Sequence, residues 1–359
     1  MTPLGTPGTA DSSTGDRPTP PTRPPVAVDV REITHRVDLQ LPDGRLNPGA
    51  VGWTRTPLHG TSGVGHVARR WGRAKRWEYW ALITPAHVVG VTVSDLDYAG
   101  LTQVWVLDRA TGDQVDEVVV KPLARGTTLP GTYGEGPASA RTSRAAVRIT
   151  DESQGTRLRA ATARVRLDVL VPLPAGHERL GVVVPWDERT FQYTLKDVAR
   201  RAAGRLRVDG VTHAIDAGWA TLDHGRGYWP RDLAWNWGFG AGVVHGRTVG
   251  LQLGGRWTDG TGSTENALVV DGRLHKIREE LTWTWTPGRW TDPWHVHGAA
   301  ADLTFLPYFD RVALTDLRLI RSSTHQCFGT WAGWVLDAAG RRQRVDGVEG
   351  SVEDVEQRW

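Results

Sequence analysis

Apolar and polar residues alternate along most of this chain, which is the pattern of half-buried β-strands. Alternation begins at Val28 and Val30 and continues to a Pro-Asp-Gly turn at 42–44. Residues 75–120 then form consecutive short apolar runs, separated by turn formers at 84–85, 98–100 and 111–113. A spacing of about ten residues per strand is typical of an antiparallel meander, sandwich or barrel.

The same pattern returns in the second half of the chain. Apolar alternation resumes over 146–170, a short run GVVVPW follows at 181–186, and further runs lie over 205–222 and 303–345. The best helical candidate is the short segment DERTFQYTLKDVARR at 187–201, although Tyr193 to Leu195 could also be extended, and no long helical periodicity is present. The sequence therefore predicts an all-β protein of two antiparallel units with few short helices.

The length of the chain favours two domains. At 359 residues it exceeds one ordinary domain. Residues 1–27 are rich in Thr, Pro, Gly and Ser, so they predict a disordered tail. We expect an N-terminal β domain over 28–187 and a C-terminal β domain over 188–359 that carries the functional site.

Composition and charge point away from nucleic acid and membranes. The net charge is only +3, and the basic cluster over 68–77 is better explained as a solvated loop or strand edge than as a phosphate-binding surface. Cys327 is the only cysteine, which fits a reducing compartment and a small buried side chain. No secretory apolar region or membrane-length apolar run is seen, so we expect a cytoplasmic protein.

One stretch, 219–277, gathers rigid aromatic residues, glycines and reactive polar groups. The chain has 18 Trp residues, which fill cores but also line ligand cavities. The aromatic members here are Trp219, Tyr228, Trp229, Trp235, Trp237 and Trp257, and the polar members are Asp223, His224, Arg226, Asp259, Glu265 and Asn266. We expect any ligand to bind here.

Several segments carry a resemblance to known proteins. The motifs GRLNPGAVGW at 44–53 and TENALVVDGRLHKI at 264–277 resemble a family of bacterial proteins known only as a domain of unknown function. More distantly, GWATLDHGRG and WNWGFGAGVVHGRTVGLQLGGR are similar to the second-domain core of the AttH and carotenoid 1,2-hydratase group. This resemblance implies a pair of lipocalin-like (calycin) units, whereas the segments GYWP and TDGTGSTEN follow the first family only.

Asp223 with His224 is the first candidate for catalysis. The hydratase resemblance implies that the acidic residue donates a proton to a carbon–carbon double bond. A carboxylic acid in an apolar, Trp-lined cavity has a raised pKa and can act as a general acid. The faces of Tyr228, Trp229, Trp235 and Trp237 would stabilise the cation that forms. In the alternative interpretation, Asp223 pairs with Arg226 or stabilises a turn.

The segment DGTGSTEN at 259–266 is the second candidate. Glu265 and Asp223 beside tryptophans would suit glycoside chemistry, with Trp257, Asp259 and Asn266 as further ligand-binding residues. A hydrogen-bond network that stabilises the loop explains these residues equally well.

Metal and cofactor signals are weak. His295 and His297 share one face of a predicted strand and Asp302 follows, but a clear third ligand from elsewhere is missing. No Walker loop, dinucleotide fingerprint or nucleophile elbow is found. We therefore expect neither a metal nor a cofactor.

These signals favour a protein that binds an apolar or amphipathic small molecule. Its enzymatic version would be a cofactor-free hydratase, cyclase or isomerase that uses a buried carboxylic acid. Carbohydrate binding or glycan chemistry is one alternative, and a structural or interaction protein without a ligand is another. The sequence leaves the oligomeric state open.

Overall fold

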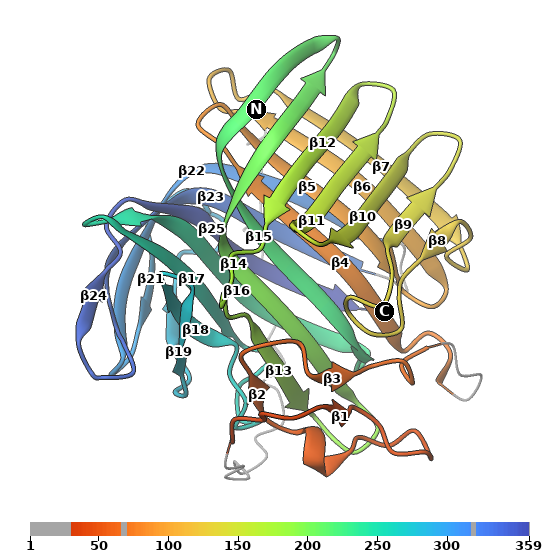
Figure 1. The fold of residues 1–359 in the computed structure, drawn as a ribbon, viewed down its shortest axis with the longest axis vertical. Helices are drawn as coiled ribbons and strands as arrows, with labels where there is room; N and C mark the ends of the chain where they lie inside the picture. Colours follow the sequence, from red (N-terminus) through yellow and green to blue (C-terminus); the bar gives the residue numbers. More distant parts are fainter. Residues whose placement is uncertain (1–29, 66–69, 317–320, 359) are drawn as a thin grey trace, which may run out of the picture.

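Two curled antiparallel sheets make up the protein (Figure 1). The computed structural model describes residues 30–65, 70–316 and 321–358; the predicted tail over 1–27 lies outside these ranges. Within them the only helical element is the 3₁₀ turn Pro48–Ala50, so the predicted all-β class is confirmed. No helix in the described part of the chain is long and apolar enough to cross a membrane.

The first sheet has the strand order β7-β6-β5-β4-β15-β14-β12-β11-β10-β9-β8, and β13 joins β14 to β2. Its strands are β2 (Trp53–Thr54), β4 (Ala74–Ile83), β5 (His87–Asp95), β6 (Ala99–Asp108), β7 (Gln114–Pro122), β8 (Thr127–Thr128), β9 (Ala138–Arg141), β10 (Ala146–Glu152), β11 (Gly155–Ala161), β12 (Val165–Pro172), β13 (Leu180–Pro185), β14 (Phe191–Val208) and β15 (Val211–Tyr228). A small parallel pair, β1 (Val37–Asp38) and β3 (His59–Gly60), lies beside it.

The second sheet has the order β19-β18-β17-β16-β25-β23-β22-β21-β20, and β24 pairs with β23. Its strands are β16 (Asp232–Val244), β17 (Arg247–Gly255), β18 (Asn266–Val270), β19 (Arg273–Ile277), β20 (Thr282–Thr284), β21 (Trp294–His297), β22 (Ala301–Asp316), β23 (Arg321–Leu336), β24 (Arg342–Arg344) and β25 (Val348–Arg358). Neighbouring strands are mostly consecutive in sequence, as the meander pattern predicts.

The best helical candidate, 187–201, forms no helix: these residues turn at 187–190 and then enter strand β14, as the extended alternative for 193–195 allowed. Phe191, Tyr193 and Leu195 alternate with polar residues and point into the core of the first sheet. β14 also has partners on both edges, since it pairs with β13 and β15. Tertiary pairing therefore decides the conformation of a segment whose local signal is ambiguous.

The chain changes sheets between Tyr228 and Asp232. Strands β14 and β15 hydrogen bond within the first sheet, so the predicted division at 187/188 does not coincide with the change of sheet. As a result, the Trp-rich stretch 219–277 begins in the first sheet and continues in the second. Its residues can therefore meet across the boundary between the sheets.

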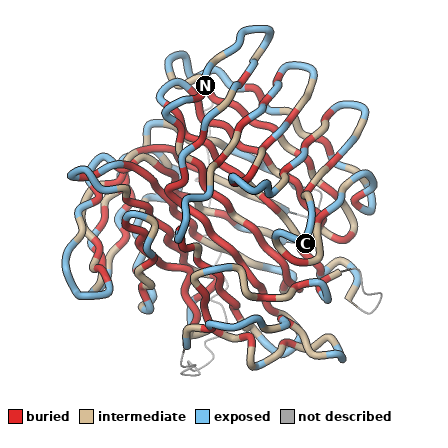
Figure 2. Tube along the Cα trace, viewed as in Figure 1, coloured by how far each residue is buried: buried red, intermediate tan, exposed pale blue. Residues whose placement is uncertain are grey.

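Three apolar cores hold the fold together. One lies within each curled sheet, and the third lies between them. Figure 2 shows buried segments concentrated in the middle of the molecule, where the sheets meet. The third core includes Ile83 and Val182 from the first sheet with Trp237, Phe239 and Phe328 from the second. The interface between the sheets is thus built like a domain interior.

Candidate functional site between the sheets

A row of polar residues crosses the first sheet at this interface. Tyr79 on β4 lies directly opposite Asp223 on β15, and Asp223 lies directly opposite Lys196 on β14. Directly opposed residues on neighbouring strands point to the same face of a sheet. The register therefore sets a phenol, a carboxylate and an ammonium group side by side.

A matching row crosses the second sheet. Arg311 on β22 is opposite Gln326 on β23, which is opposite Glu353 on β25, which is opposite Trp237 on β16. The two rows meet, because Gln326 Nε2 donates to the Tyr79 hydroxyl at 3.2 Å. The site thus draws its residues from both sheets.

Lys196 is the centre of an ion-pair cluster. Its Nζ lies 2.9 Å from Asp223 Oδ1 and 3.2 Å from Glu265 Oε2. The same ammonium lies 4.4 Å from the centre of the Trp237 ring. Burial alone would lower the pKa of Lys196, but the charges of Asp223 and Glu265 outweigh burial and raise it. One cation is therefore shared between two carboxylates that come from different sheets.

Among the carboxyl groups of these two polar rows, Glu353 is the one suited to carry a proton at neutral pH. Burial and then the negative charge of Asp223 raise its pKa to about 7. Gln326 Nε2 donates to its Oε1 at 2.6 Å, and Trp235 Nε1 lies 3.4 Å from its Oε2. Glu353 is half-buried, and the Asp223 side chain keeps 16% of its surface exposed. Solvent therefore reaches this part of the interface.

Glu265 is more deeply enclosed than Glu353. Its side chain is 1% exposed, and Trp257 Nε1 donates to its Oε1 at 2.6 Å. Burial and the charge of Asp223 raise its pKa, while the charge of Lys196 opposes them. The loop between β17 and β18 brings Trp257 and Glu265 over the first sheet, and Ser263 anchors it by donating to the carbonyl of Val183 at 2.8 Å.

Edge-to-face tryptophans form one wall of the site. The Trp229 ring lies 5.6 Å from Trp235, 5.3 Å from Trp77 and 6.2 Å from Trp186, each nearly perpendicular. Trp229, Trp237 and Trp257 are buried, so they do not present the exposed faces expected of a carbohydrate platform. Trp235 is only half-buried and remains available for contact with a ligand.

Gly225 is required for this wall, because a Cβ atom there would lie 2.1 Å from the Trp77 ring. We expect Gly225→Ala to displace Trp77 and to lower the free energy of unfolding by about 1–3 kcal/mol through overpacking. Urea denaturation measures this change. Gly65→Ala is the control, because a Cβ there meets nothing within 4 Å. Equal stability of the two variants would contradict the packing described.

The structure brings some predicted site residues together and separates others. Asp223 and Glu265 converge with Trp235, Trp237 and Trp257. His224 does not join Asp223, because successive residues of a strand point to opposite faces. It is fully buried near Tyr133 on the other face of β15, and burial lowers its pKa well below the usual range. Arg226 lies three positions after Asp223 on β15, so its side chain also points to the opposite face, and the two residues do not pair.

Asp259 and Asn266 have local roles in their loop. The Asp259 carboxylate accepts from the backbone of Arg256 at 2.9 Å in an exposed turn. Asn266 is buried and bridges Gly254 N, at 2.7 Å, to the carbonyl of Glu279, at 3.0 Å. These two residues therefore fit the alternative interpretation of the segment, a hydrogen-bond network that stabilises the loop. Tyr228 lies on the face of β15 opposite to Asp223, where it lines a cavity beside β1 and β3.

His295 and His297 lie on β21, next to the edge strand β20 of the second sheet. His295 Nε2 is 2.8 Å from Asp302, and the two imidazole rings are 4.9 Å apart. Among the residues that the structure describes, no group of three or more His, Cys, Asp or Glu side chains is arranged to hold a metal. Cys327 is buried, and burial raises the pKa of its thiol, which fits its interpretation as a small core residue.

Sequence reasoning missed Lys196 and Glu353. Lys196 is one of only four lysines in an arginine-rich chain, which was an available signal, but it lies in the segment that was the best helical candidate. Glu353 belongs to the alternating run SVEDVEQ at the end of the chain, where a polar residue is usually taken to face solvent. Only the pairing of β25 with β16 and β23 turns it toward the other sheet.

Comparison with solved structures confirms the predicted lipocalin-like architecture. A candidate AttH protein from Nitrosomonas europaea matches with a TM-score of 0.51 and 14% identity, over 80% of this chain and 93% of that one. Kievitone hydratase from Nectria haematococca matches with a TM-score of 0.50 and 14% identity, over 80% and 89%. CghA with Sch210972 matches with a TM-score of 0.50 and 11% identity, over 80% and 88%.

The amino-acid sequence of the chain matches a known protein family. No protein of curated function matches the chain. The family described as "Domain of unknown function (DUF2804)" matches residues 30–359, which is nearly all of it. The chain therefore belongs to this family, as its motifs predicted.

Proposed function

We propose that this family member binds an apolar or amphipathic small molecule between its two sheets and catalyses a cofactor-free hydration, cyclisation or isomerisation there. The observation that carries the proposal is the Glu353 carboxyl group, whose pKa of about 7 keeps much of it protonated near neutral pH. This carboxyl takes the role that the sequence suggested for Asp223, which is instead engaged in an ion pair with Lys196.

The proton balance of a hydration is simple. Glu353 gives its proton to one carbon of a double bond, water adds to the other carbon, and the proton released by water returns to the carboxylate. In a cyclisation or isomerisation, the cationic intermediate loses a proton to the Glu353 carboxylate, which restores the acid for the next turnover. Trp235 lies beside the carboxyl and offers an aromatic surface to the cationic carbon.

The ion-pair cluster has a positioning role in this proposal. The Lys196 ammonium occupies the face of Trp237, so that ring is not available to a substrate cation. Lys196 fixes Asp223, and the charge of Asp223 contributes to the raised pKa of Glu353. The name of one structural neighbour, kievitone hydratase, states a hydration. We extend that class of reaction to this chain, and the cyclisation and isomerisation alternatives are supported by the proton-carrying Glu353 carboxyl group.

Binding of an uncharged apolar probe tests the proposal. N-phenyl-1-naphthylamine should bind with increased fluorescence, and Trp235→Ala should weaken binding about tenfold, because truncation of a central aromatic side chain removes contact area. Trp334→Ala is the control, since Trp334 packs against Arg342 eight residues along β23 from Gln326. Mass spectrometry of apolar molecules that co-purify with the wild type would identify the natural ligand class. If the probe binds both variants as it binds the wild type, the ligand site does not lie between the sheets.

A further inference from the structure

A cavity opens beside β1 and β3, next to the end of β15 at Tyr228. Its volume is about 860 Å³. Its walls come from the loop after β1, from the turn before β4 and from the turn before β14, and Tyr228 of β15 closes its inner side. Tyr228 and Asp223 are five residues apart on one strand, so their side chains point to opposite faces. This cavity is therefore separate from the site between the sheets.

Three arginines outnumber two aspartates in the walls of this cavity. Arg70, Arg73 and Arg189 line it, together with Asp38 and Asp43. Asp43 is already paired with Arg45, whose Nε lies 2.7 Å from its Oδ2. Among the described residues no carboxylate pairs with Arg70 or Arg73, while Arg189 has a weak exposed contact of 3.4 Å with Glu188. The guanidinium groups thus keep donors to offer to a ligand.

Arg70 is held in place by aromatic stacking. Its guanidinium carbon lies 4.7 Å from the centre of the Tyr228 ring. The Tyr228 hydroxyl is within 3.3 Å of the carbonyls of Gly63 and Gly65, and these hydrogen bonds hold the ring in position. A stacked guanidinium loses less freedom when it binds an oxyanion than a mobile one does. Arg73 Nη1 donates to the carbonyl of Trp229 at 3.4 Å, and its other nitrogen donors can contact a ligand.

The cavity also has an apolar part. Leu41 and Pro42 belong to its lining, on the turn that ends at Gly44. We infer that this cavity is a second ligand site, which binds a small organic anion with a carboxylate or phosphate group on an apolar body. The anionic group lies among Arg70, Arg73 and Arg189, and the apolar body packs on Leu41 and Pro42.

Isothermal titration calorimetry with three probes of equal chain length tests this inference. Hexanoate and hexyl phosphate carry the two anionic groups, and 1-hexanol carries none. We expect at least one anion to bind about tenfold or more tightly than the alcohol, because a hydrogen bond to a charged group is worth about one factor of ten or more. The anion that binds tightly distinguishes a carboxylate ligand from a phosphate ligand.

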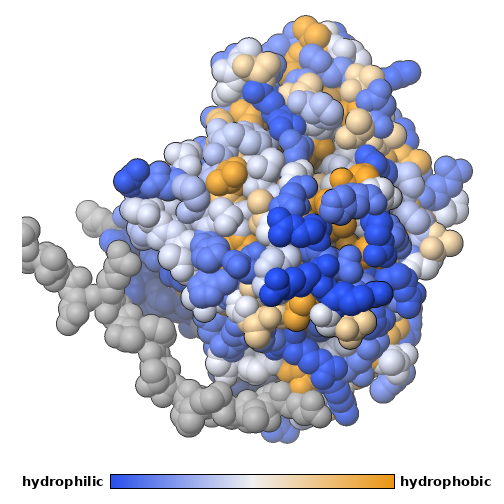
Figure 3. Space-filling view, turned by 90° about the vertical axis from the view of Figure 1, so that its left-hand side faces the viewer, coloured by the Kyte–Doolittle hydropathy of each residue, from blue (hydrophilic) through white to orange (hydrophobic). Residues whose placement is uncertain are grey.

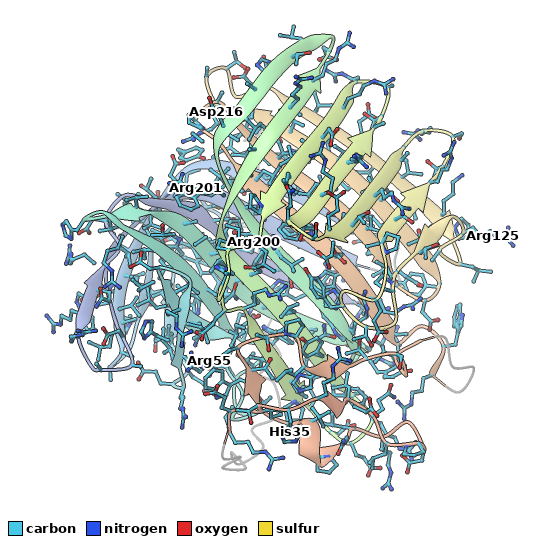
Figure 4. All side chains as sticks on the ribbon, in the orientation of Figure 1. His35, Arg55, Arg125, Arg200, Arg201 and Asp216 are labelled. Atoms are coloured by element: carbon cyan, nitrogen blue, oxygen red, sulfur yellow. The ribbon has the colours of Figure 1, made fainter. Side chains whose placement is uncertain are left out.

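Variants locate the binding site of the anion. Arg70→Gln and Arg73→Gln should each weaken anion binding about tenfold. Arg73 is exposed, so its variant should fold even if Arg70→Gln does not. Arg125→Gln is the charge-matched control, because Arg125 projects into solvent at the right-hand edge of Figure 4. Glu353→Gln should leave anion binding unchanged, which separates this site from the proposed catalytic one. Equal affinity for alcohol and anions, or equal anion affinity in the wild type and Arg73→Gln, would overturn the inference.

Discussion

Replacement of Lys196 by methionine should lower the free energy of unfolding by about 3–5 kcal/mol, the usual cost of removing one partner from a buried ion pair. Asp223 and Glu265 would then face each other without the ammonium that lies 2.9 Å from one and 3.2 Å from the other. At neutral pH the wild type has the full stabilising contribution of Lys196, so the variant should show the whole loss of stability there. Since the pKa of Lys196 is raised, its contribution is fully present below about 10.5, the ordinary lysine value, and disappears only as the pH rises through the folded-state pKa.

Guanidinium denaturation at pH 7 measures this effect. Lys121→Met on β7 is the matched control, because the structure shows no ion pair for Lys121 within the described ranges, and its change should stay within about 0.5 kcal/mol. Adding Asp223→Asn and Glu265→Gln to Lys196→Met should restore part of the lost stability, since the uncompensated charges are then removed. A loss below about 1 kcal/mol for Lys196→Met would mean that the cluster is solvated and not buried.

Glu353→Gln should reduce turnover of the natural substrate by about 10²–10⁴-fold, the usual contribution of a general acid. In the wild type, turnover should fall as the pH rises through about 7, because the carboxyl group loses the proton that it must donate. Glu356→Gln on the same strand is the control, since its side chain is 68% exposed. If Glu353→Gln keeps full activity with an unchanged pH profile, another group donates the proton.

The same carboxyl group links stability to pH. The pKa of Glu353 is raised in the folded state above its ordinary value of 4.5, so its favourable contribution is present below pH 4.5 and is lost as the pH rises through about 7. The glutamine variant should lack this part of the pH dependence, whereas Glu356→Gln should keep it. The face of the molecule drawn in Figure 3 is largely hydrophilic, with apolar residues in separate patches.

The sequence predicts the strands better than their partners. Alternation over 75–120 identifies β4 to β7, and the turn formers between them mark the hairpins correctly. The Trp-rich stretch also leads to Asp223 and Glu265, because reactive carboxyl groups beside aromatic residues are unusual enough to be noticed. Alternation alone does not decide which face of β15 meets the second sheet, so His224 could not be separated from Asp223 in function.

Long-range register explains the residues that were missed. Lys196 meets Asp223 because β14 and β15 pair over eighteen-residue strands, and Glu353 meets Trp237 because the last strand inserts between β16 and β23. β25 is far from β16 in the chain, so a local pattern carries no information about their pairing. β14 and β15 form a hairpin, but the register shifts between Asp197 and Arg200 and between Ala202 and Gly204 mean that alternation alone does not give the partner of Lys196. The ambiguous local signal over 187–201 also hid Lys196, since a helix would have turned its neighbours to other faces.

The most direct test of the account is the titration of Glu353 itself. NMR detection of the side-chain carboxyl carbon, with the signal assigned by its absence in Glu353→Gln, gives the pKa in the intact protein. Burial between the sheets next to Asp223 predicts a midpoint of about 7. A midpoint near the ordinary value of 4.5 would show that Glu353 is solvated, and it would contradict a proton-donating site between the two sheets.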